Sequence, residues 1–420
     1  MCILQDDLSD WHTEAASMRQ VYASALCNIA ATSAYNSSIG LSFRRDIDCS
    51  APFEVLAPDQ FGLTGKTQRL TKYLLYPRFS YCNDIENAPL NERAWVMQER
   101  LLSTRIMHFT SSGVYWECLT NISSDVYPES LPVPMLDASK TVHTKLLLLK
   151  NDTTGADTTN TSHVTQAWHN KQYDTWNLLC ERYSLMKMTV PGDKLVAIQG
   201  IAQRLSQTNG DALACGLWKE RLIPQLLWMV DPLRFTIGPP ATHWRAPSWS
   251  WASQSRPMRH VAHIDCDNGQ AKASVERIEV VAHASGQLKS ALLTLRGRVV
   301  EAKLEFETAA IRFSNEDAVA HLTCKDKTVQ LRGPFLDICD ESPTPLHEQI
   351  LCIGVYTDSC QSKVVDVVVP HTWELGVLVL EQYSLDPAKY QWIGIFLLDT
   401  KESRVYTSLE SLEERSITII

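Results

Sequence analysis

The sequence of 420 residues lacks the short motifs that mark many catalytic and ligand-binding sites. It contains no GxSxG, GxxxxGK[ST], HExxH or GxGxxG pattern. Its twelve cysteines stand singly, with no CxxC pair and no Cys/His cluster at the spacing of zinc ligands. We therefore expect reduced, mostly buried thiols in an intracellular protein, and we predict no metal site.

Basic clusters and long apolar runs are missing as well. The net charge is -9, and no group of Lys and Arg exceeds two or three residues, which argues against nucleic acid as a partner. No apolar run approaches the roughly 20 residues that span a bilayer. The N-terminus lacks the basic and apolar regions of a secretory signal. These absences favour a cytoplasmic protein without a membrane span.

The first region, residues 1–150, has the strand–helix pattern of an α/β domain. Residues 2–4 read as the end of a buried strand, and Asp10 is the predicted N-cap of an amphipathic helix of about five turns. Residues 91–102, NERAWVMQERLL, are a second predicted helix. It leads into RIMHFT, a Ser-Ser-Gly turn and VYWEC, which together predict a β-hairpin.

Two further regions differ from the first in composition. The polar stretch NDTTGADTTNTSH (151–163) is the predicted linker, and AWHNKQYDTWNLLCERYSLM and DKLVAIQGIAQRL make residues 151–240 a helical connecting region. Residues 241–420 contain ALLTLRGRVVEAKLEF, CIGVYTD, VVDVVV, WELGVLVLEQY and YQWIGIFLLDT, which predict a mostly antiparallel β domain. The predicted fold class is therefore α+β overall.

Two short stretches each allow a functional and a structural interpretation. HVAHID places His260 and His263 three residues apart with Asp265 beyond, but a strand would put the two histidines on opposite faces, so surface histidines are favoured over a metal site. RAPSWSWAS puts Trp249 and Trp251 on one face of an extended segment. The pair could stack a ligand; a packed pair at the junction of the helical region and the β domain is favoured.

Polar residues follow the first predicted strand. Gln5, Asp6 and Asp7 lie at its carboxyl end, and Glu14 lies near the start of the next helix. In open α/β sheets, ligands bind in the crevice at this end of the strands. A carboxylate there could stabilise the oxocarbenium-like transition state of glycoside cleavage. On residue chemistry alone, the favoured alternative is that Glu14 complements the helix dipole.

Several stretches together resemble the fungal heterokaryon incompatibility (HET) domain family. They are CILQDDLSDWHTEAASMRQVYASALCNIAATSA, GLSFRRD, LNERAWVMQERLLSTRIMHFTSSGVYWEC and PGDKLVAIQGIAQRL, and GLWKERLIPQLLW and RAPSWSWAS are similar to elements found downstream of the domain. In the family, further α/β structure precedes the first of these stretches, including a segment like Ser-Tyr-Cys-Trp-Gly. We therefore expect that the chain lacks the N-terminal part of the domain, leaving an incomplete α/β sheet.

The resemblance implies non-self recognition, in which activation leads to growth arrest or programmed cell death. HET domains have been compared with TIR domains, signalling modules of flavodoxin-like architecture, some of which cleave NAD at the nicotinamide–ribose bond. The key glutamate of those enzymes lies four residues beyond a tryptophan, whereas Trp11 and Glu14 are three apart here. The resemblance implies Glu14 as the catalytic residue and NAD as a candidate substrate. The candidate binding residues are Trp11, from the resemblance, and Gln5 and Asp6, from their position at the end of the predicted strand.

Three functions stay open at this point. The first is a signalling module that works through a protein partner or self-association. The second is an enzyme on the same scaffold, either a TIR-like NAD glycohydrolase or a tailoring enzyme that acts on a small molecule of secondary metabolism. The third is an inactive, truncated paralogue. No cofactor is predicted for any of them.

Overall fold

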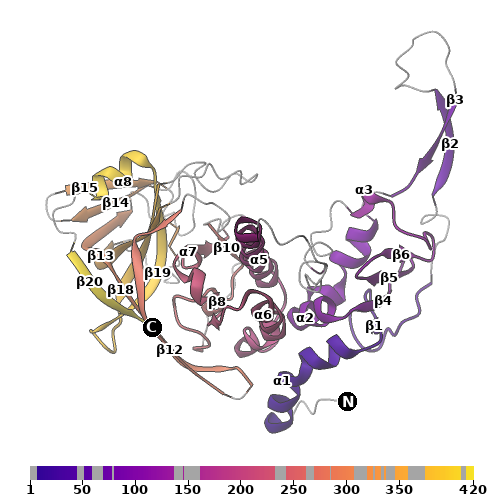
Figure 1. Ribbon diagram of the computed structural model, residues 1–420, viewed down its shortest axis with the longest axis horizontal. Coiled ribbons are helices and arrows are strands. Elements are labelled where there is room, and N and C mark those ends of the chain that lie inside the picture. Colours follow the sequence, from indigo (N-terminus) through magenta and orange to yellow (C-terminus); the bar gives the residue numbers. More distant parts are fainter. Residues whose placement is uncertain are drawn as a thin grey trace. The chain divides into compact units, whose positions relative to one another are not determined.

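The computed structural model describes most of the chain (Figure 1). The described residues are 7–44, 52–58, 70–77, 80–136, 145, 161–231, 243–261, 269–283, 285–306, 319–324, 327–332, 335–336, 346–357, 374–407 and 413–420. They form two compact units: Ser17–Asp152, called the smaller unit below, and Met1–Ala16 with Thr153–Ile420, called the larger unit. Each unit is described by itself.

Helix α1 (Leu8–Ser24) begins one position after Asp7. The Asp7 carboxylate accepts hydrogen bonds from the backbone N–H groups of Ser9 (2.8 Å) and Asp10 (3.2 Å), donors that otherwise lack partners at a helix start. Asp7 is therefore the N-cap, and the prediction of Asp10 was wrong. Asp10 lies in the first turn, where its charge faces the positive end of the helix dipole. The 17 residues make about five turns, as predicted.

A four-stranded mixed sheet forms the centre of the smaller unit. Its order is β1 (Asn28–Ala30), β4 (Arg105–Phe109), β5 (Val114–Cys118) and β6 (Ile122–Ser124). Strands β1 and β4 are parallel, and the other two pairs are antiparallel. The β4–β5 hairpin is the one predicted from the alternating residues of RIMHFT and VYWEC.

Helix α2 (Ala94–Leu102) is the second predicted helix, and it buries seven of its nine residues. It starts later than predicted because η3 (Pro89–Glu92) is a 3₁₀ turn and Arg93 is extended. Further elements among the described residues of this unit are the π-helical turn η2 (Cys82–Glu86), α3 (Val133–Leu136) and the hairpin of β2 (Phe53–Pro58) with β3 (Leu70–Leu75).

In the larger unit, the first described elements after residue 153 are the helices predicted for the connecting region. These are α5 (Thr161–Ser184), α6 (Val196–Asn209) and α7 (Leu222–Gln225). Short elements accompany them: η4 (Pro191–Asp193), β7 (Leu213–Ala214), β8 (Leu217–Trp218), η5 (Lys219–Arg221), β9 (Trp228–Val230), η7 (Trp251–Ser253) and β10 (Met258–His260). Residues 151–160 of the predicted linker lie outside the described residues.

A tight turn between β7 and β8 organises the helical part. Cys215 (φ 51°) and Gly216 (φ 90°) both have positive φ, the signature of a type I′ hairpin turn. The carbonyl of Gly216 accepts hydrogen bonds from the indole N–H groups of Trp176 and Trp251, both at 3.0 Å. The carbonyl of Cys215 accepts one from Ser250 Oγ at 2.6 Å. The turn thus joins α5 to the RAPSWSWAS stretch.

The tryptophans of RAPSWSWAS are packed in the core, as favoured from the sequence. Trp249 and Trp251 are fully buried. Trp228 donates its indole N–H to the Trp249 carbonyl at 3.0 Å and stacks on Trp392 of the β domain with ring centroids 4.0 Å apart. The segment is not extended, however, because Ser250 caps the 3₁₀ turn η7 that contains Trp251.

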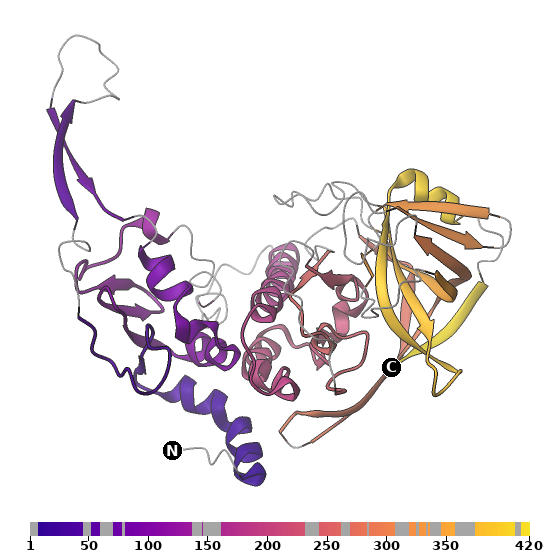
Figure 2. The same ribbon diagram turned by 180° about the vertical axis from the view of Figure 1, so that it is seen from behind.

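Most of the β domain is a sheet closed on itself (Figure 2). The ring consists of β13 (Leu288–Phe306), β17 (Leu346–Thr357), β18 (Leu375–Gln382), β19 (Lys389–Leu398) and β20 (Glu413–Ile419), with β20 pairing back to β13. Only β19 and β20 are parallel, and α8 (Thr400–Thr407) connects them. The predicted antiparallel β domain is therefore confirmed.

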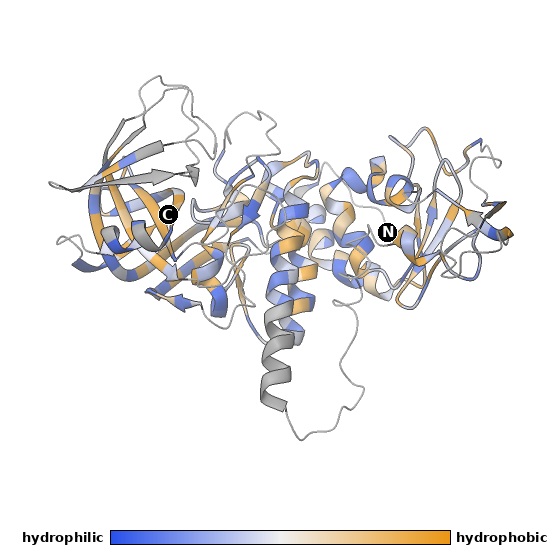
Figure 3. Cartoon of the chain, turned by 90° about the horizontal axis from the view of Figure 1, so that it is seen from above, coloured by the Kyte–Doolittle hydropathy of each residue, from blue (hydrophilic) through white to orange (hydrophobic). Residues whose placement is uncertain are grey.

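Apolar side chains fill this ring, and Figure 3 shows hydrophobic residues interspersed with hydrophilic ones along its strands. The buried cluster includes Val300, Cys352, Val377, Val379 and Phe396. Further strands attach to the ring: β11 (Gln270–Ala271), β12 (Ala273–Ala282), β14 (Val319–Cys324), β15 (Lys327–Arg332) and β16 (Phe335–Leu336). The predicted strand VVDVVV lies outside the described residues.

Candidate functional site

The residues proposed from the sequence are only partly placed. Trp11 and Glu14 lie on α1, where a spacing of three puts them on one side of the helix, and both are half-buried. Gln5 and Asp6 lie outside the described residues. The grouping of these four residues into one site therefore stays a prediction.

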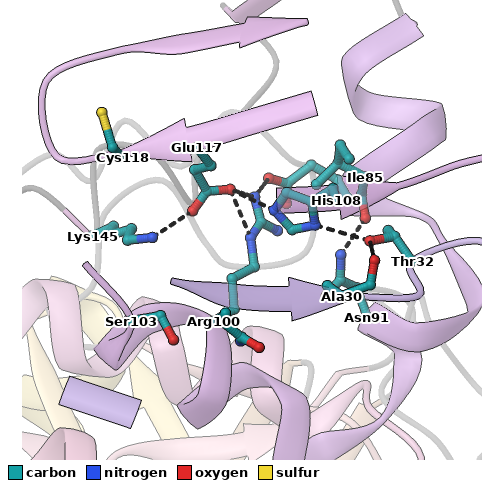
Figure 4. A network of polar contacts seen from close by, with 12 residues as sticks. Ala30, Thr32, Ile85, Asn91, Arg100, Ser103, His108, Glu117, Cys118 and Lys145 are labelled. Carbon is teal, nitrogen blue, oxygen red and sulfur yellow. Dashed lines mark hydrogen bonds and ion pairs between the residues drawn. The ribbon is translucent and has the colours of Figure 1, made fainter. Parts of the chain in front are cut away.

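A different group of side chains forms a buried ionic cluster in the smaller unit (Figure 4). Strand β5 supplies Glu117, β4 supplies His108 and α2 supplies Arg100. Because alternate residues of a strand share a face, Glu117 and His108 point inward with their apolar neighbours Tyr115 and Ile106. Tyr81, Glu86, Thr32 and Lys145 complete the cluster.

Glu117 lies at the centre of the ionic cluster, with 2% of its side chain exposed. Its Oε2 accepts hydrogen bonds from Arg100 Nη2 (2.8 Å) and Nε (3.1 Å), from Tyr81 (3.1 Å) and from His108 Nε2 (3.3 Å). Its Oε1 accepts one from Lys145 Nζ at 2.9 Å. Burial favours the neutral acid, but Arg100, His108 and Lys145 outweigh it and hold the pKa of Glu117 well below its usual range.

The charges of the ionic cluster compensate one another. Arg100 Nη2 also donates to Glu86 Oε1 (3.1 Å) and to the Tyr81 hydroxyl (3.0 Å). Burial lowers the pKa of Lys145, and the nearby Glu117 carboxylate opposes that shift. Two carboxylates thus face a guanidinium and an ammonium, with every contact hydrogen-bonded, which is what buried charges need to be tolerated.

His108 links the ionic cluster to β1. Its Nε2 faces the Glu117 carboxylate, which only accepts, so Nε2 carries a proton. Burial lowers the pKa of His108 and favours the neutral ring, whose Nδ1 then accepts from Thr32 Oγ1 at 2.9 Å. Thr32, His108 and Glu117 therefore have the hydroxyl–imidazole–carboxylate order of nucleophilic catalysis.

A cavity of about 160 Å³ adjoins the ionic cluster between β1, α2 and β4. Its polar lining residues are Asn28, Asn91, Glu99, Arg100 and His108. Its lining does not include Thr32, which is fully buried. A molecule in this cavity would therefore contact the imidazole of His108 and not the hydroxyl of Thr32. The hydroxyl–imidazole–carboxylate arrangement thus lacks an exposed nucleophile. The arrangement is suited to holding α2 and β1 against the sheet and to lining a pocket.

Glu99 is the carboxyl group that this cavity exposes to a ligand. Burial raises the pKa of Glu99, while a hydrogen bond from Tyr22 and the charge of Arg93 act in the opposite direction. Burial, together with Glu99, also raises the pKa of Tyr22. A carboxyl group with a raised pKa that lines a cavity can accept or donate a proton more readily near neutral pH.

The predicted histidine pair is not a surface feature at His260. This residue lies on β10, and both of its ring nitrogens are buried. Burial lowers its pKa to about 3. His263 and Asp265 lie outside the described residues. Among the residues that the structure describes, no group of three or more His, Cys, Asp or Glu side chains is arranged to hold a metal ion.

Sequence reasoning missed the ionic cluster because its members come from separate segments. Arg100 belongs to the predicted helix, and His108 and Glu117 belong to the predicted hairpin, with no partner predicted for any of the three. A signal was present, since both occupy inward positions of strands whose other inward residues are apolar. A charged residue at such a position predicts a buried, paired group.

Comparison with known proteins gives one finding. The family model described as "Heterokaryon incompatibility protein (HET)" matches residues 1–99. The matched range contains α1, β1 and the cavity residues Asn28, Asn91 and Glu99, whereas Arg100, His108 and Glu117 lie beyond it. No curated protein and no solved structure matches the chain. No helix in the described ranges combines the length and apolar character that crossing a membrane requires.

Proposed function

Since the chain carries a segment of the HET family over residues 1–99, we propose that it acts in fungal non-self recognition. In this proposal it is a cytoplasmic signalling module that triggers growth arrest or cell death by binding a protein partner or a second copy of itself. The family match is the observation that carries the proposal. A TIR-like or flavodoxin-like sheet is its structural part; the pairing of β1 with β4 is parallel, as in such sheets, whereas the pairings of β4 with β5 and of β5 with β6 are antiparallel.

Two features of the smaller unit favour an interaction module over an enzyme. The ionic cluster has compensated charges, and its hydroxyl does not reach the cavity. Large apolar side chains between α1 and residue 41 are exposed, including Leu26 and Tyr35, each 82% exposed. Exposed apolar and aromatic side chains of this kind are common where proteins bind one another.

NAD cleavage at Glu14 is the competing proposal. Its support is the position of Glu14 near the start of α1, three residues after Trp11. A carboxylate in this position would stabilise positive charge on the ribose as the bond to nicotinamide breaks. The proposal requires that Glu14→Gln abolish activity, because the amide carries no charge.

Inducible expression of the full chain in a filamentous fungus, with growth and cellular NAD followed together, tests both proposals. The variants are Glu14→Gln, with Asp10→Asn on the same helix as control, and Leu26→Glu with Tyr35→Glu, with Leu385→Glu as control. Leu385 is 81% exposed and lies in the larger unit, so its variant matches the change without touching the proposed surface.

Arrest that persists in Glu14→Gln, leaves NAD unchanged and disappears in Leu26→Glu with Tyr35→Glu supports the interaction module. Loss of NAD that disappears only in Glu14→Gln overturns it and supports the enzyme. Correct folding with neither arrest nor NAD loss overturns both proposals and supports an inactive paralogue.

A further inference from the structure

We infer that the cavity between β1, α2 and β4 is a binding site for a neutral molecule of one six-membered ring that carries an amide or an equivalent hydrogen-bonding group. This inference does not rest on the proposed function, because it uses only the lining of the cavity. It would hold for a signalling module that senses a metabolite and equally for an enzyme.

The size of the cavity sets the size of the ligand. Its volume is about 160 Å³. An apolar cavity of about 150 Å³ in another protein binds benzene. A single six-membered ring therefore fits within the cavity.

The lining has one apolar part and one polar part. Apolar lining residues include Ala31, Leu90, Val96 and Ile106, which come from the residue after β1, from η3, from α2 and from β4. These side chains suit the faces of a ring, which gain from leaving water. A purely apolar ligand would displace water from the polar lining residues without offering them hydrogen bonds in return. A ligand that carries a polar group therefore fits better.

The hydrogen-bonding groups match an amide. Asn91 Nδ2 already donates to the Ile85 carbonyl at 2.5 Å, which leaves Asn91 Oδ1 as an acceptor. Asn28 also lines the cavity, and a side-chain amide carries both a donor and an acceptor. Glu99 adds a carboxyl group. An amide N–H₂ group and its carbonyl oxygen would find complementary partners among these three side chains.

The charges argue for a neutral ligand. Arg100 lines the cavity, but its guanidinium is held by Glu117 and Glu86 at 2.8–3.1 Å. An anion would have to compete with these two buried carboxylates. The Glu99 carboxyl group already has a hydrogen bond from Tyr22 and the charge of Arg93 beside it, so a cation would have to compete with Arg93.

The test uses one ring with four substituents. The full chain is titrated with benzamide, benzoate, benzamidine and toluene, and binding is followed by ligand-observed NMR and by chemical shifts of the protein. We expect benzamide to bind about tenfold more tightly than each of the other three, a ratio that a single well-placed polar contact supplies.

Two variants locate the binding. Ala31→Leu fills the cavity and should abolish benzamide binding, whereas Ala23→Leu, on an exposed position of α1, should leave it unchanged. Circular dichroism checks that both variants fold. Glu99→Gln keeps the hydrogen-bonding groups and should change the benzamide affinity by less than about threefold, while Glu99→Leu should weaken it about tenfold.

Each other outcome overturns the inference. Tighter binding of benzoate or benzamidine would assign the site to a charged ligand. Equal binding of toluene would remove the role of the polar residues. If none of the four probes binds, or if benzamide binds folded Ala31→Leu as well as the unaltered chain, the cavity is not a site for this class of ligand.

Discussion

Replacing Glu117 by Gln should destabilise the smaller unit more than most single changes do. The variant keeps the size of the side chain and removes the charge that Arg100 and Lys145 face at 2.8 Å and 2.9 Å. Arg100 retains Glu86, but Lys145 is left as a buried ammonium opposite an amide. Removing one partner of a buried ion pair costs about 3–5 kcal/mol, out of the roughly 5–15 kcal/mol that stabilise a typical domain.

The size of this loss is measured by hydrogen exchange of the β4 and β5 amides in urea, in the full chain. Glu117→Gln with Lys145→Met removes both charges and should recover at least about 1 kcal/mol relative to Glu117→Gln, because groups in contact couple by about 0.5–3 kcal/mol. A loss below about 1 kcal/mol for Glu117→Gln would show that the ionic cluster is not a buried, dry ion pair.

The free energy of unfolding of the unaltered chain should depend on pH through the same Glu117 carboxylate. The folded pKa of Glu117 is held below its usual range by Arg100, His108 and Lys145, against the effect of burial. Its contribution is therefore fully present above the unfolded pKa, about 4.3, and is lost as pH falls through the folded pKa. In Glu117→Gln the unfolding free energy should fall less steeply over this acid range. An unchanged slope would refute the assignment.

Three further predictions concern other parts of the chain. Gly216→Ala should lower the free energy of unfolding by about 3 kcal/mol, because φ is 90° and the new Cβ would lie 2.8 Å from Trp251 Nε1. Gly210→Ala, with φ 73° and open space around the new Cβ, should lower it by about 1 kcal/mol. Equal losses for the two variants in urea unfolding would contradict this difference. His260→Phe should flatten the stability of the larger unit between pH 6.5 and 3 by about 1.4 kcal/mol per pH unit, because only the unfolded histidine gains a proton there; an unchanged slope would refute its burial. Asp7→Ala removes the N-cap of α1, a loss of about 1 kcal/mol, and should therefore speed hydrogen exchange of the amides in the first turn. Unaltered exchange would exclude Asp7 as the cap.

Local patterns predicted the secondary structure well where one face of an element is buried. The β4–β5 hairpin follows the alternation of RIMHF and VYWEC, and α6 follows the apolar spacing of DKLVAIQGIAQRL. Helix starts were less accurate, since Asp7 and Asp10 are both good caps by residue type and only the backbone decides between them.

Contacts between segments that are far apart in the sequence could not be predicted. Arg100 meets Glu117 across a turn and a strand, and Lys145 comes from a segment further along. Periodicity says which face of an element is buried, but it does not say which charged side chain another segment brings to that face. The Trp249–Trp251 prediction succeeded for the opposite reason, because bulky aromatic side chains are buried in almost any packing.

The closed ring of the β domain has a consequence for how the protein is made. Leu293 of β13 pairs with Ile419 of β20, so the seam of the barrel joins segments separated by most of the domain. A ribosome releases β13 long before β20, and until β20 emerges one edge of β13 and the apolar interior of the barrel have no final partner. Because translation adds about 5–20 residues per second, this unpaired, aggregation-prone edge of β13 stays exposed for several seconds. Chaperone binding to nascent chains that end before β20, and its loss once β20 has been made, is the behaviour expected of this topology.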